Sequence, residues 1–164
     1  MSTELLIDSA QNGSRIALLQ DKQLVELHSE GMDNQFKVGD IYLGTVRKIV
    51  NGLNAAFIDV GYEKDAFLHY QDLGSNINSL LKFTKMVRNN NYSNHLLKGF
   101  ENEAEIEKVG KIEKILAKTN QVLVQVVKEP ISTKGPRLSC ELSLPGRYLV
   151  LVPFSDTVNV SKKI

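Results

Sequence analysis

Residues 55–69 carry two arms of alternating residues, and this alternation restricts the fold more than any other feature of the chain. Successive side chains of a β-strand point to opposite faces, so each arm has one aliphatic face and one mostly polar face. The polar faces also carry Phe57, beside Asp59, and Phe67. If residues 61–63 form the turn of a hairpin, Phe57 lies opposite Phe67 on the neighbouring strand. We therefore expect a hairpin with two aromatic rings on its wet face.

Short β patterns also occur on both sides of this hairpin. Three of them predict an amino-terminal β-meander with turns at Asn12–Gly13 and Asp21–Lys22. They cover residues 4–9, 14–20 and 22–30. Three longer stretches follow at residues 37–50, 120–130 and 136–144. Together with the two arms of the hairpin, these longer stretches predict a mainly β fold built on a small five-stranded barrel.

A long polar excursion separates the third and fourth of the five barrel strands, at residues 74–119. Its asparagine-rich middle, residues 89–94, is typical of a loose loop. Apolar residues then recur at helical spacing amid glutamate and lysine, which predicts a short helix. These residues are Ile106, Val109, Ile112 and Ile115. We expect a disordered or loosely held excursion that ends in this helix, with residues 74–110 as a flexible insertion.

The two terminal blocks of the chain are both β-rich, and two arrangements accommodate them. In the first, residues 4–30 pair with residues 141–164, so the barrel is an insertion in a second sheet and the chain has two subdomains. In the second, the chain is a single β-rich domain with one long loop. Periodicity alone does not decide between them. The chain stops at Ile164 without a terminating feature, which suggests a part of a longer protein.

Composition excludes several classes of protein. With 42% hydrophobic and 24% charged residues, the chain is typical of a globular domain and not of a disordered one. The single cysteine, Cys140, excludes an internal disulfide and suits a reducing compartment, so we expect a cytoplasmic protein. The three histidines, His28, His69 and His95, are too scattered for a zinc site. The sequence contains no signal-peptide pattern and no window apolar enough to span a membrane.

Two rings on a solvated barrel face offer flat apolar surfaces to nucleobases. Stacking contributes about 1–3 kcal/mol per base whatever the base is, and oligonucleotide-binding (OB) barrels bind single strands on such a face. The opposing interpretation is that Phe57 and Phe67 pack beneath the excursion or against another sheet. Basic residues near one barrel edge favour nucleic acid, because they neutralise backbone phosphates. The candidates are Lys37, Arg47, Lys48, Lys64, Lys128, Lys134 and Arg137.

Catalytic patterns are weak in this sequence. Asp59 and Asp65 fall on the aromatic face, but a hydrolytic metal site needs more convergent oxygen ligands. No serine has the GxSxG context of a hydrolase, and the stretch TKGPR is too short for a phosphate-binding loop. A basic cluster precedes the asparagine-rich loop and an acidic run, residues 101–107, follows it. The cluster consists of Lys82, Lys85 and Arg88. The residues by themselves indicate a binding module.

Three blocks of sequence resemble a known family. They are KVGDIYLGTVRKIVNGLNAAFIDVGYEKDAFLHYQDL (residues 37–73), VLVQVVKEPISTKGPRLSCELSLPGRYLVLVP (residues 122–153) and VNVSKKI (residues 158–164). In this order and spacing they closely resemble the amino-terminal part of the ribonuclease E/G family of bacterial endoribonucleases. The resemblance covers the chain except for about residues 74–110.

The resemblance implies a fold of two interleaved parts. A five-stranded S-one type OB barrel, residues 35–140, is inserted in part of an RNase H-like β-rich subdomain. The long polar excursion and a short helix lie between barrel strands three and four. Residues 1–34 form the first part of the RNase H-like subdomain, and residues 141–164 form its truncated second part. The first of the two arrangements is therefore expected.

The resemblance also assigns roles to residues of this chain. Phe57, Phe67 and Lys134 match the surface that clamps single-stranded RNA in this family. The barrel pattern places three further basic residues near this surface, and we expect them to supplement its positive charge; they are Lys37, Arg47 and Lys48. A second set belongs to part of a pocket that senses the RNA 5′-monophosphate; it comprises Gly146, Val150 and Lys162.

The family implies a function in RNA metabolism. Its members cut single-stranded RNA with Mg²⁺-activated water in ribosomal RNA processing and messenger RNA decay, and form homo-oligomers with shared zinc. We expect this chain to bind single-stranded RNA, preferentially 5′-monophosphorylated, and to lack the catalytic carboxylates, so that alone it cuts nothing. The alternatives are a stand-alone OB-fold protein, nucleic-acid-binding or chaperone-like, and a protein-interaction module.

Overall fold

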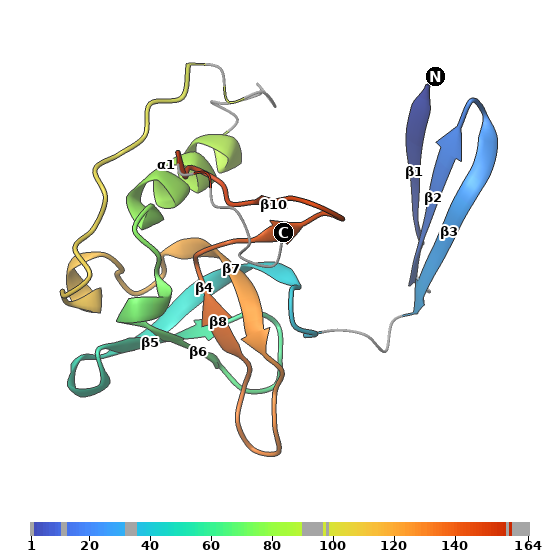
Figure 1. Cartoon of the computed structure of the whole chain (residues 1–164). Helices are drawn as coiled ribbons and strands as arrows, with labels where there is room; N and C mark the ends of the chain where they lie inside the picture. The colour runs from blue at the N-terminus through green and yellow to red at the C-terminus, as the bar shows by residue number, and fades with distance from the viewer. Residues whose placement is uncertain are drawn as a thin grey trace. The chain divides into compact units, whose positions relative to one another are not determined.

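The computed structural model separates into two units, Met1–Gln35 and Phe36–Ile164 (Figure 1). The residues described are 2–10, 13–31, 36–89, 97, 99–156 and 158. None of the helices in these ranges is long and apolar enough to cross a membrane.

The first unit is an antiparallel three-stranded meander. Its strands, in the order β1-β2-β3, are β1 (Thr3–Ala10), β2 (Gly13–Gln20) and β3 (Gln23–Gly31). The predicted amino-terminal meander is thus confirmed. Many aliphatic residues of this sheet are exposed, among them Leu5 and Leu27 at 60% each. The predicted assembly of residues 1–34 with residues 141–164 stays a prediction.

The second unit contains a closed five-stranded barrel in the order β4-β5-β6-β8-β7, which confirms the predicted OB-type fold. Its strands are β4 (Ile41–Val50), β5 (Ala55–Asp59), β6 (Ala66–His69), β7 (Gln121–Lys128) and β8 (Arg137–Ser139). The hairpin of β5 and β6 has the predicted register, with Phe57 opposite Phe67. The barrel closes where β8 runs parallel to β6, placing Arg137 beside Phe67. At this point the Phe67 N–H donates to the Pro136 carbonyl over 2.8 Å.

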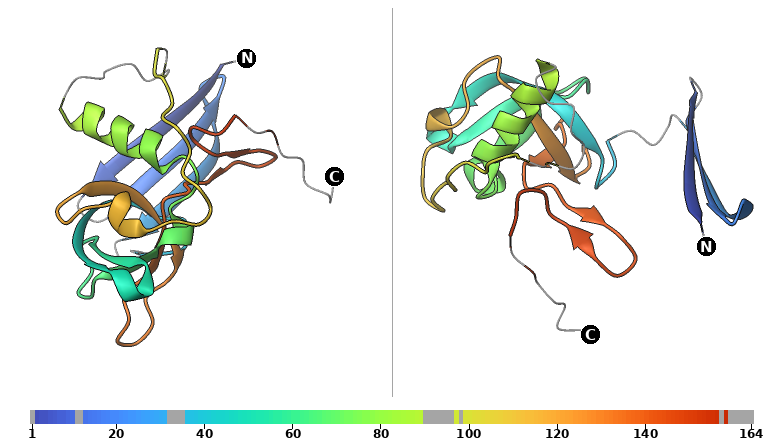
Figure 2. Two further views of the ribbon diagram at one scale, coloured as in Figure 1. Left: turned by 90° about the vertical axis from the view of Figure 1, so that its left-hand side faces the viewer. Right: turned by 90° about the horizontal axis from the view of Figure 1, so that it is seen from above.

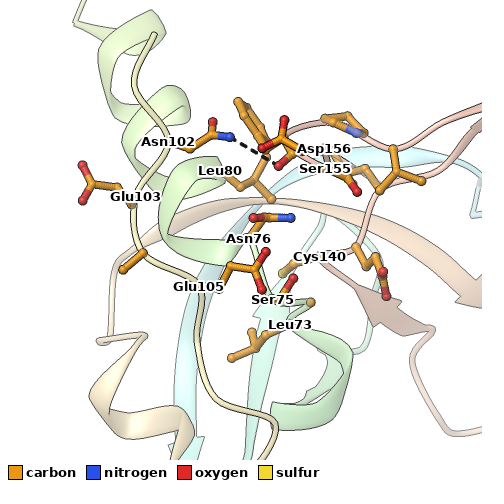
Figure 3. A pocket seen from close by; sticks show the side chains of 17 residues that line it. Leu73, Ser75, Asn76, Leu80, Asn102, Glu103, Glu105, Cys140, Ser155 and Asp156 are labelled. Carbon is orange, nitrogen blue, oxygen red and sulfur yellow. Dashed lines mark hydrogen bonds between the residues drawn. The ribbon is translucent and has the colours of Figure 1, made fainter. Parts of the chain in front are cut away.

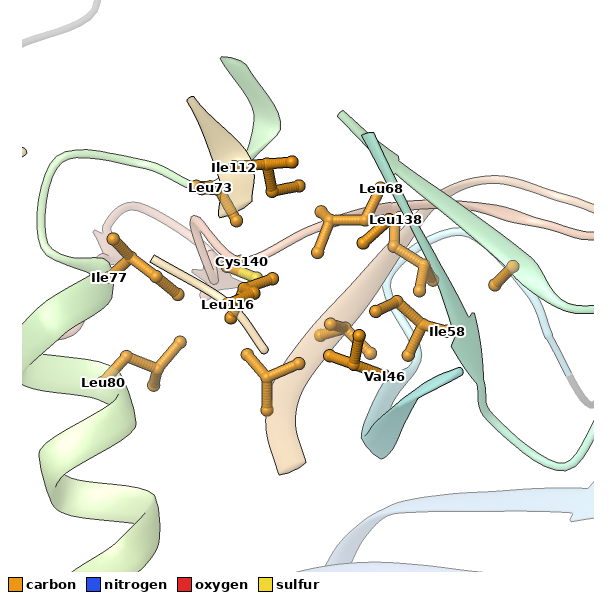
Figure 4. Packing of buried hydrophobic residues seen from close by; sticks show 14 of the residues in the cluster. Val46, Ile58, Leu68, Leu73, Ile77, Leu80, Ile112, Leu116, Leu138 and Cys140 are labelled. Carbon is orange, nitrogen blue, oxygen red and sulfur yellow. The ribbon is translucent and has the colours of Figure 1, made fainter. Parts of the chain in front are cut away.

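Aliphatic residues from every barrel strand fill the interior (Figure 4). Val46, Ile58, Leu68 and Leu138 are all at most 1% exposed. They occupy the alternate positions whose neighbours point outward, as a half-buried strand requires. Burial of each such side chain stabilises the fold by about 1.5–3 kcal/mol. The inward pattern also fixes which residues face solvent, and therefore which face carries the two rings.

The excursion between β6 and β7 carries a short helix, as predicted, but its predicted position is wrong. The helix α1 is Ile77–Arg88, near the start of the excursion, and lies against the barrel beside β7 (Figure 2). Ile77 and Leu80 of α1 join the barrel core. The amphipathic spacing of the sequence INSLLKFTKMVR accounts for this helix, because its apolar residues fall on one face.

The residues expected to form the helix adopt other structures. Ile112–Lys114 is a single 3-10 turn, and Ile112 and Leu116 are buried in the core beside α1. Ile106 lies in extended chain, where its N–H donates to the Ser75 carbonyl over 2.9 Å, and Val109 is 86% exposed. The expectation of a loosely held excursion is also wrong for the segments at both of its ends, because each contributes buried residues to the barrel core.

After β8 the chain forms a two-stranded hairpin of β9 (Leu144–Pro145) and β10 (Val150–Leu151). The residues that follow return to the excursion, where the ring of Phe154 packs against those of Phe83 and Phe100 with centroids 5.7 and 5.3 Å away. An aromatic cluster therefore joins α1, the excursion and the segment after β10.

Cys140 provides a test of the core. Its side chain is 4% exposed, and burial, with a further contribution from Asp72, raises the pKa of the thiol. Because the thiolate is the reactive form, we expect the native protein to resist a thiol reagent at about pH 8, whereas the chain in denaturant reacts like an ordinary cysteine. Absorbance of the released chromophore measures both rates. Equal rates with and without denaturant would show that the thiol is not in the core.

Candidate nucleic-acid interface

One row of side chains crosses all five barrel strands. Lys48 of β4 is opposite Phe57 of β5, which is opposite Phe67 of β6. Phe67 is beside Arg137 of β8, which is opposite Lys128 of β7. Side chains directly opposite on neighbouring strands share a face, so two rings lie at the middle of the row with cations on both sides.

The rings of Phe57 and Phe67 are half-buried and pack edge to face, with centroids 5.9 Å apart and planes at 72°. They line an open groove of about 810 Å³. The rest of its lining comes from the chain around the β5–β6 hairpin and from the end of β7, the start of β8 and the connection between them; it comprises Leu53, Lys64, Asp65, Lys128, Glu129, Ile131, Thr133, Lys134, Gly135 and Arg137. No described residue of the excursion lines this groove. The described residues of the excursion therefore do not cover the rings.

A tight turn at residues 131–134 contributes to the groove lining. Ile131 and Lys134 exchange two backbone hydrogen bonds of 3.2 and 3.0 Å, and Ser132 between them has a φ of 52°. The turn places Lys134 in the lining of the groove that the two rings also line. Ile131 is 71% exposed and adds apolar surface at the same tip.

Gly135 fixes this turn against the β5–β6 hairpin. Its backbone passes so close to the carbonyl groups of Lys64 and Asp65 that a Cβ atom at this position would collide with them. Glycine is needed here for close approach of two backbones. Glycine at position 135 therefore lets the chain that follows Lys134 pack against the β5–β6 hairpin.

Arg137 is held in place by Asp72. The guanidinium donates from Nε to Oδ2 over 3.1 Å and from Nη2 to Oδ1 and Oδ2 over 3.1 and 2.8 Å. A bidentate pair of this kind has a defined geometry, so the Arg137 cation stays beside Phe67. The carboxylate also offsets part of its charge.

Two of the predicted RNA-binding cations are not part of the groove lining, and each forms an ion pair. Arg47 donates from Nε to Asp59 over 3.1 Å, and the Gly61 N–H followed by this guanidinium lowers the pKa of the Asp59 carboxyl. Lys37 lies 3.4 Å from Glu129. The structure thus brings Phe57, Phe67 and Lys134 together in one groove with Lys48 beside them, and leaves Lys37 and Arg47 at its periphery.

The residues assigned to the 5′-monophosphate pocket lie in the carboxyl-terminal part of the chain. Gly146 begins the turn between β9 and β10, where its N–H donates to the Leu149 carbonyl over 2.7 Å. Val150 is exposed in β10, and Lys162 lies outside the described residues. Their role stays a prediction.

A second hollow, of about 520 Å³, lies between α1, the excursion and the segment after β10 (Figure 3). Its lining includes Glu103, Glu105, Glu141 and Asp156. Carboxylates repel phosphate, so this hollow does not suit RNA. Throughout the described part of the chain, no group of three or more His, Cys, Asp or Glu side chains is placed to hold a metal ion. These residues therefore do not fit Mg²⁺ or zinc.

Sequence reasoning did not identify three residues of the interface. Leu53 and Ile131 add apolar walls, and Asp72 orients Arg137. The sequence does indicate Ile131, because it is the one aliphatic residue in the polar stretch between Pro130 and Gly135. The contacts of Leu53 and Asp72 depend on barrel closure, which no local pattern specifies.

Comparison with protein families matches residues 35–141 to the S1 RNA binding domain. The chain belongs to the S1 RNA-binding domain family. This match spans the whole barrel, including the groove with its two rings, and it accounts for an aromatic pair on the solvated face of an OB barrel. RNA binding follows for the domain as a class.

Curated relatives extend the similarity beyond the S1 domain. Ribonuclease G of Haemophilus influenzae is 37% identical over 99% of this chain and 29% of its own length. Ribonuclease G of Escherichia coli is 32% identical over the full chain and 30% of its own length, and a ribonuclease E/G-like protein of Porphyra purpurea is 39% identical over 79% and 20%. The chain spans about 30% of the length of the ribonucleases G that it matches. The resemblance to the ribonuclease E/G family is confirmed.

Replacement of Gly135 tests how the groove wall is held. Gly135→Ala forces two backbones apart, so we expect the free energy of unfolding to fall by about 1–3 kcal/mol. Gly52→Ala is the matched control, because nothing lies within 4 Å of a Cβ there and its φ is not left-handed. We expect that control to be neutral or to stabilise by about 0.4–1 kcal/mol. Urea unfolding measures both, and equal stabilities would contradict the close approach.

Proposed function

We propose that this chain binds single-stranded RNA in the groove between the Phe57–Phe67 pair and Lys134. The observation that carries the proposal is the row in which two half-exposed rings lie between basic residues on one barrel face. Rings in this position stack with unpaired bases, and the cations neutralise the phosphates on either side. Base-paired RNA does not offer free base faces, so the groove selects single strands.

Lys37 and Arg47 supplement the positive field of the groove in this proposal. Each is exposed and paired with a carboxylate. Exposed ion pairs contribute only about 0–1 kcal/mol, so a passing phosphate competes with Glu129 or Asp59 for the cation. Lys48 has no ion pair with another described residue and lies directly opposite Phe57, so we expect it to contribute more than either.

The whole protein is proposed to be a ribonuclease G-like endoribonuclease acting in ribosomal RNA processing and messenger RNA decay in the cytoplasm. Similarity to ribonuclease G covers segments on both sides of the barrel, which supports this proposal over a stand-alone OB protein. Cleavage with Mg²⁺ and assembly into homo-oligomers belong to the proposal for the whole enzyme. We assign binding, and not cleavage, to the described residues, because they hold no cluster of carboxylates that fits Mg²⁺.

Substitution of the rings tests the proposal. Phe57→Leu and Phe67→Leu keep apolar bulk but remove the stacking face. We expect each to weaken binding of a short 5′-hydroxyl RNA by about 1–3 kcal/mol, which is roughly 5- to 150-fold. Fluorescence anisotropy with a labelled oligonucleotide measures the change.

Tyr148→Leu is the control for these substitutions, because Tyr148 is an exposed aromatic residue, 78% accessible, in the β9–β10 turn and outside the groove lining. We expect it to bind the 5′-hydroxyl RNA as the unchanged chain does. If the two ring variants also bind normally while keeping the fold, the groove is not the RNA-binding site.

A preference for 5′-monophosphorylated RNA is proposed to involve Gly146, Val150 and Lys162. Removal of one cation near a phosphate weakens its binding, so Lys162→Ala should reduce affinity for 5′-phosphorylated RNA more than for 5′-hydroxyl RNA of the same sequence. Competition between the two RNAs measures the ratio of the affinity for 5′-phosphorylated RNA to the affinity for 5′-hydroxyl RNA. If this ratio is one for the unchanged chain, the assignment of a 5′-monophosphate pocket to these residues is contradicted.

A further inference from the structure

A second groove, of about 340 Å³, lies where the last turns of α1 meet the start of β7. Leu81 lines its inner side, and the remaining lining is polar or basic. The polar and basic residues are Thr84, Lys85, Arg88, Asn89, Thr119, Asn120 and Gln121. No residue of this described lining is acidic or aromatic, which distinguishes it from both the ring-lined groove and the acidic hollow.

No carboxylate of the described residues pairs with the cations of this second groove. Lys85 and Arg88 are three residues apart on α1, so their side chains are neighbours on one helix face. Both are exposed, and neither forms an ion pair with another described residue. Lys82, one turn earlier, is paired with Glu103 over 2.7 Å. The positive charge is therefore concentrated at the end of the helix that borders the groove.

Asn120 adds an oriented donor to the groove. Its Oδ1 accepts the Ala117 N–H over 2.7 Å, and no described residue accepts a hydrogen bond from its amide Nδ2, so this group can donate to a ligand. Two cations and neutral donors without an aromatic ring suit phosphate oxygens and sugar hydroxyls and offer no stacking surface for bases. The chemistry of the groove therefore fits the backbone of a nucleic acid.

The second groove borders β4, the strand that pairs with β5 and places Lys48 opposite Phe57. Asn120 accepts a hydrogen bond from the Val46 N–H over 2.8 Å, and Thr119 donates to the Val46 carbonyl over 2.9 Å. Lys48, which is opposite Phe57, follows two residues later on β4. The register shifts between Val46 and Lys48, so β4 bends there and covers the interval in no more than roughly 7 Å. A lining residue of each groove thus pairs with β4, Asn120 with Val46 and Phe57 with Lys48, at positions two residues apart.

We propose that the Lys85–Arg88 groove is a second subsite for single-stranded RNA, which holds the sugar–phosphate backbone of nucleotides that extend past Lys48 from the ring-lined groove. The proposal rests on the proposed function of the rings. OB folds engage about 4–16 nucleotides, so one strand of ordinary length reaches both subsites. Bases stack in the first groove, and the second adds affinity that depends on length and salt but not on sequence.

Oligonucleotides of two lengths test this subsite. We compare 5′-hydroxyl RNAs of about 4 and about 12 nucleotides at several salt concentrations, since only the longer one reaches both grooves. Lys85→Ala and Arg88→Ala should each lower the slope of log affinity against log salt by about 0.7 for the longer RNA. Binding of the shorter RNA should stay unchanged in both variants, because it occupies only the rings.

Lys108→Ala is the matched control. It removes an equal charge from an exposed lysine in a different hollow, whose lining includes Glu107 and Glu141. We expect the control to leave the slope and the affinity for the longer RNA as they are. Circular dichroism shows whether α1 persists in Lys85→Ala and Arg88→Ala. Lys85→Gln also removes the charge of Lys85 but keeps a longer side chain than Lys85→Ala does.

The two proposals fail in different ways. If Lys85→Ala, Lys85→Gln and Arg88→Ala match Lys108→Ala with the longer RNA, the second subsite is overturned, while ring-dependent binding of the shorter RNA still supports the first groove. If Phe57→Leu has no effect on the shorter RNA, the proposed function is overturned, and the subsite as an extension of it falls with it. A slope change in the two α1 variants alone, with normal binding of the shorter RNA, supports the subsite.

Discussion

Closure of the barrel between β6 and β8 brings together residues that are far apart in the sequence. The parallel contact places Arg137 beside Phe67, and the connection that precedes β8 brings Lys134 into the lining of the same groove. The hydrogen bond from Phe67 to Pro136 is worth only about 0.5–1.5 kcal/mol, so closure relies mainly on the buried aliphatic interior. Gly135 then permits the close backbone approach. Without this closure the chain has a hairpin with two exposed rings and no groove.

The segments at both ends of the excursion pack into the barrel core, and this packing sets where the basic residues of α1 lie. Ile77 and Leu80 on one side and Ile112 and Leu116 on the other belong to the same core as the barrel strands. Burial of these side chains fixes α1 against β7, and so fixes the position of its basic last turn near β4. A segment with a polar composition therefore contributes a second charged surface to the barrel, while the acidic hollow on its other side stays unsuited to RNA.

Period-two alternation was sufficient to predict the strands and the Phe57–Phe67 register from the sequence, because both depend on residues close together in the chain. The complete row was not predictable, since register shifts beside Lys48 in β4 and Lys128 in β7 decide which side chains line up. The helix was misplaced because the aliphatic residues at 106–115 have helical spacing but pack as extended chain and a single turn. Tertiary packing overrode that local pattern.

The central claim is that unpaired bases lie on the rings of Phe57 and Phe67, and nuclear magnetic resonance tests it most directly. In a complex with a short 5′-hydroxyl RNA, the account predicts nuclear Overhauser effects between base protons and the ring protons of both residues, together with shifts of the Lys134 amide. Effects confined to other parts of the chain, with both rings unchanged at saturating RNA, would contradict it.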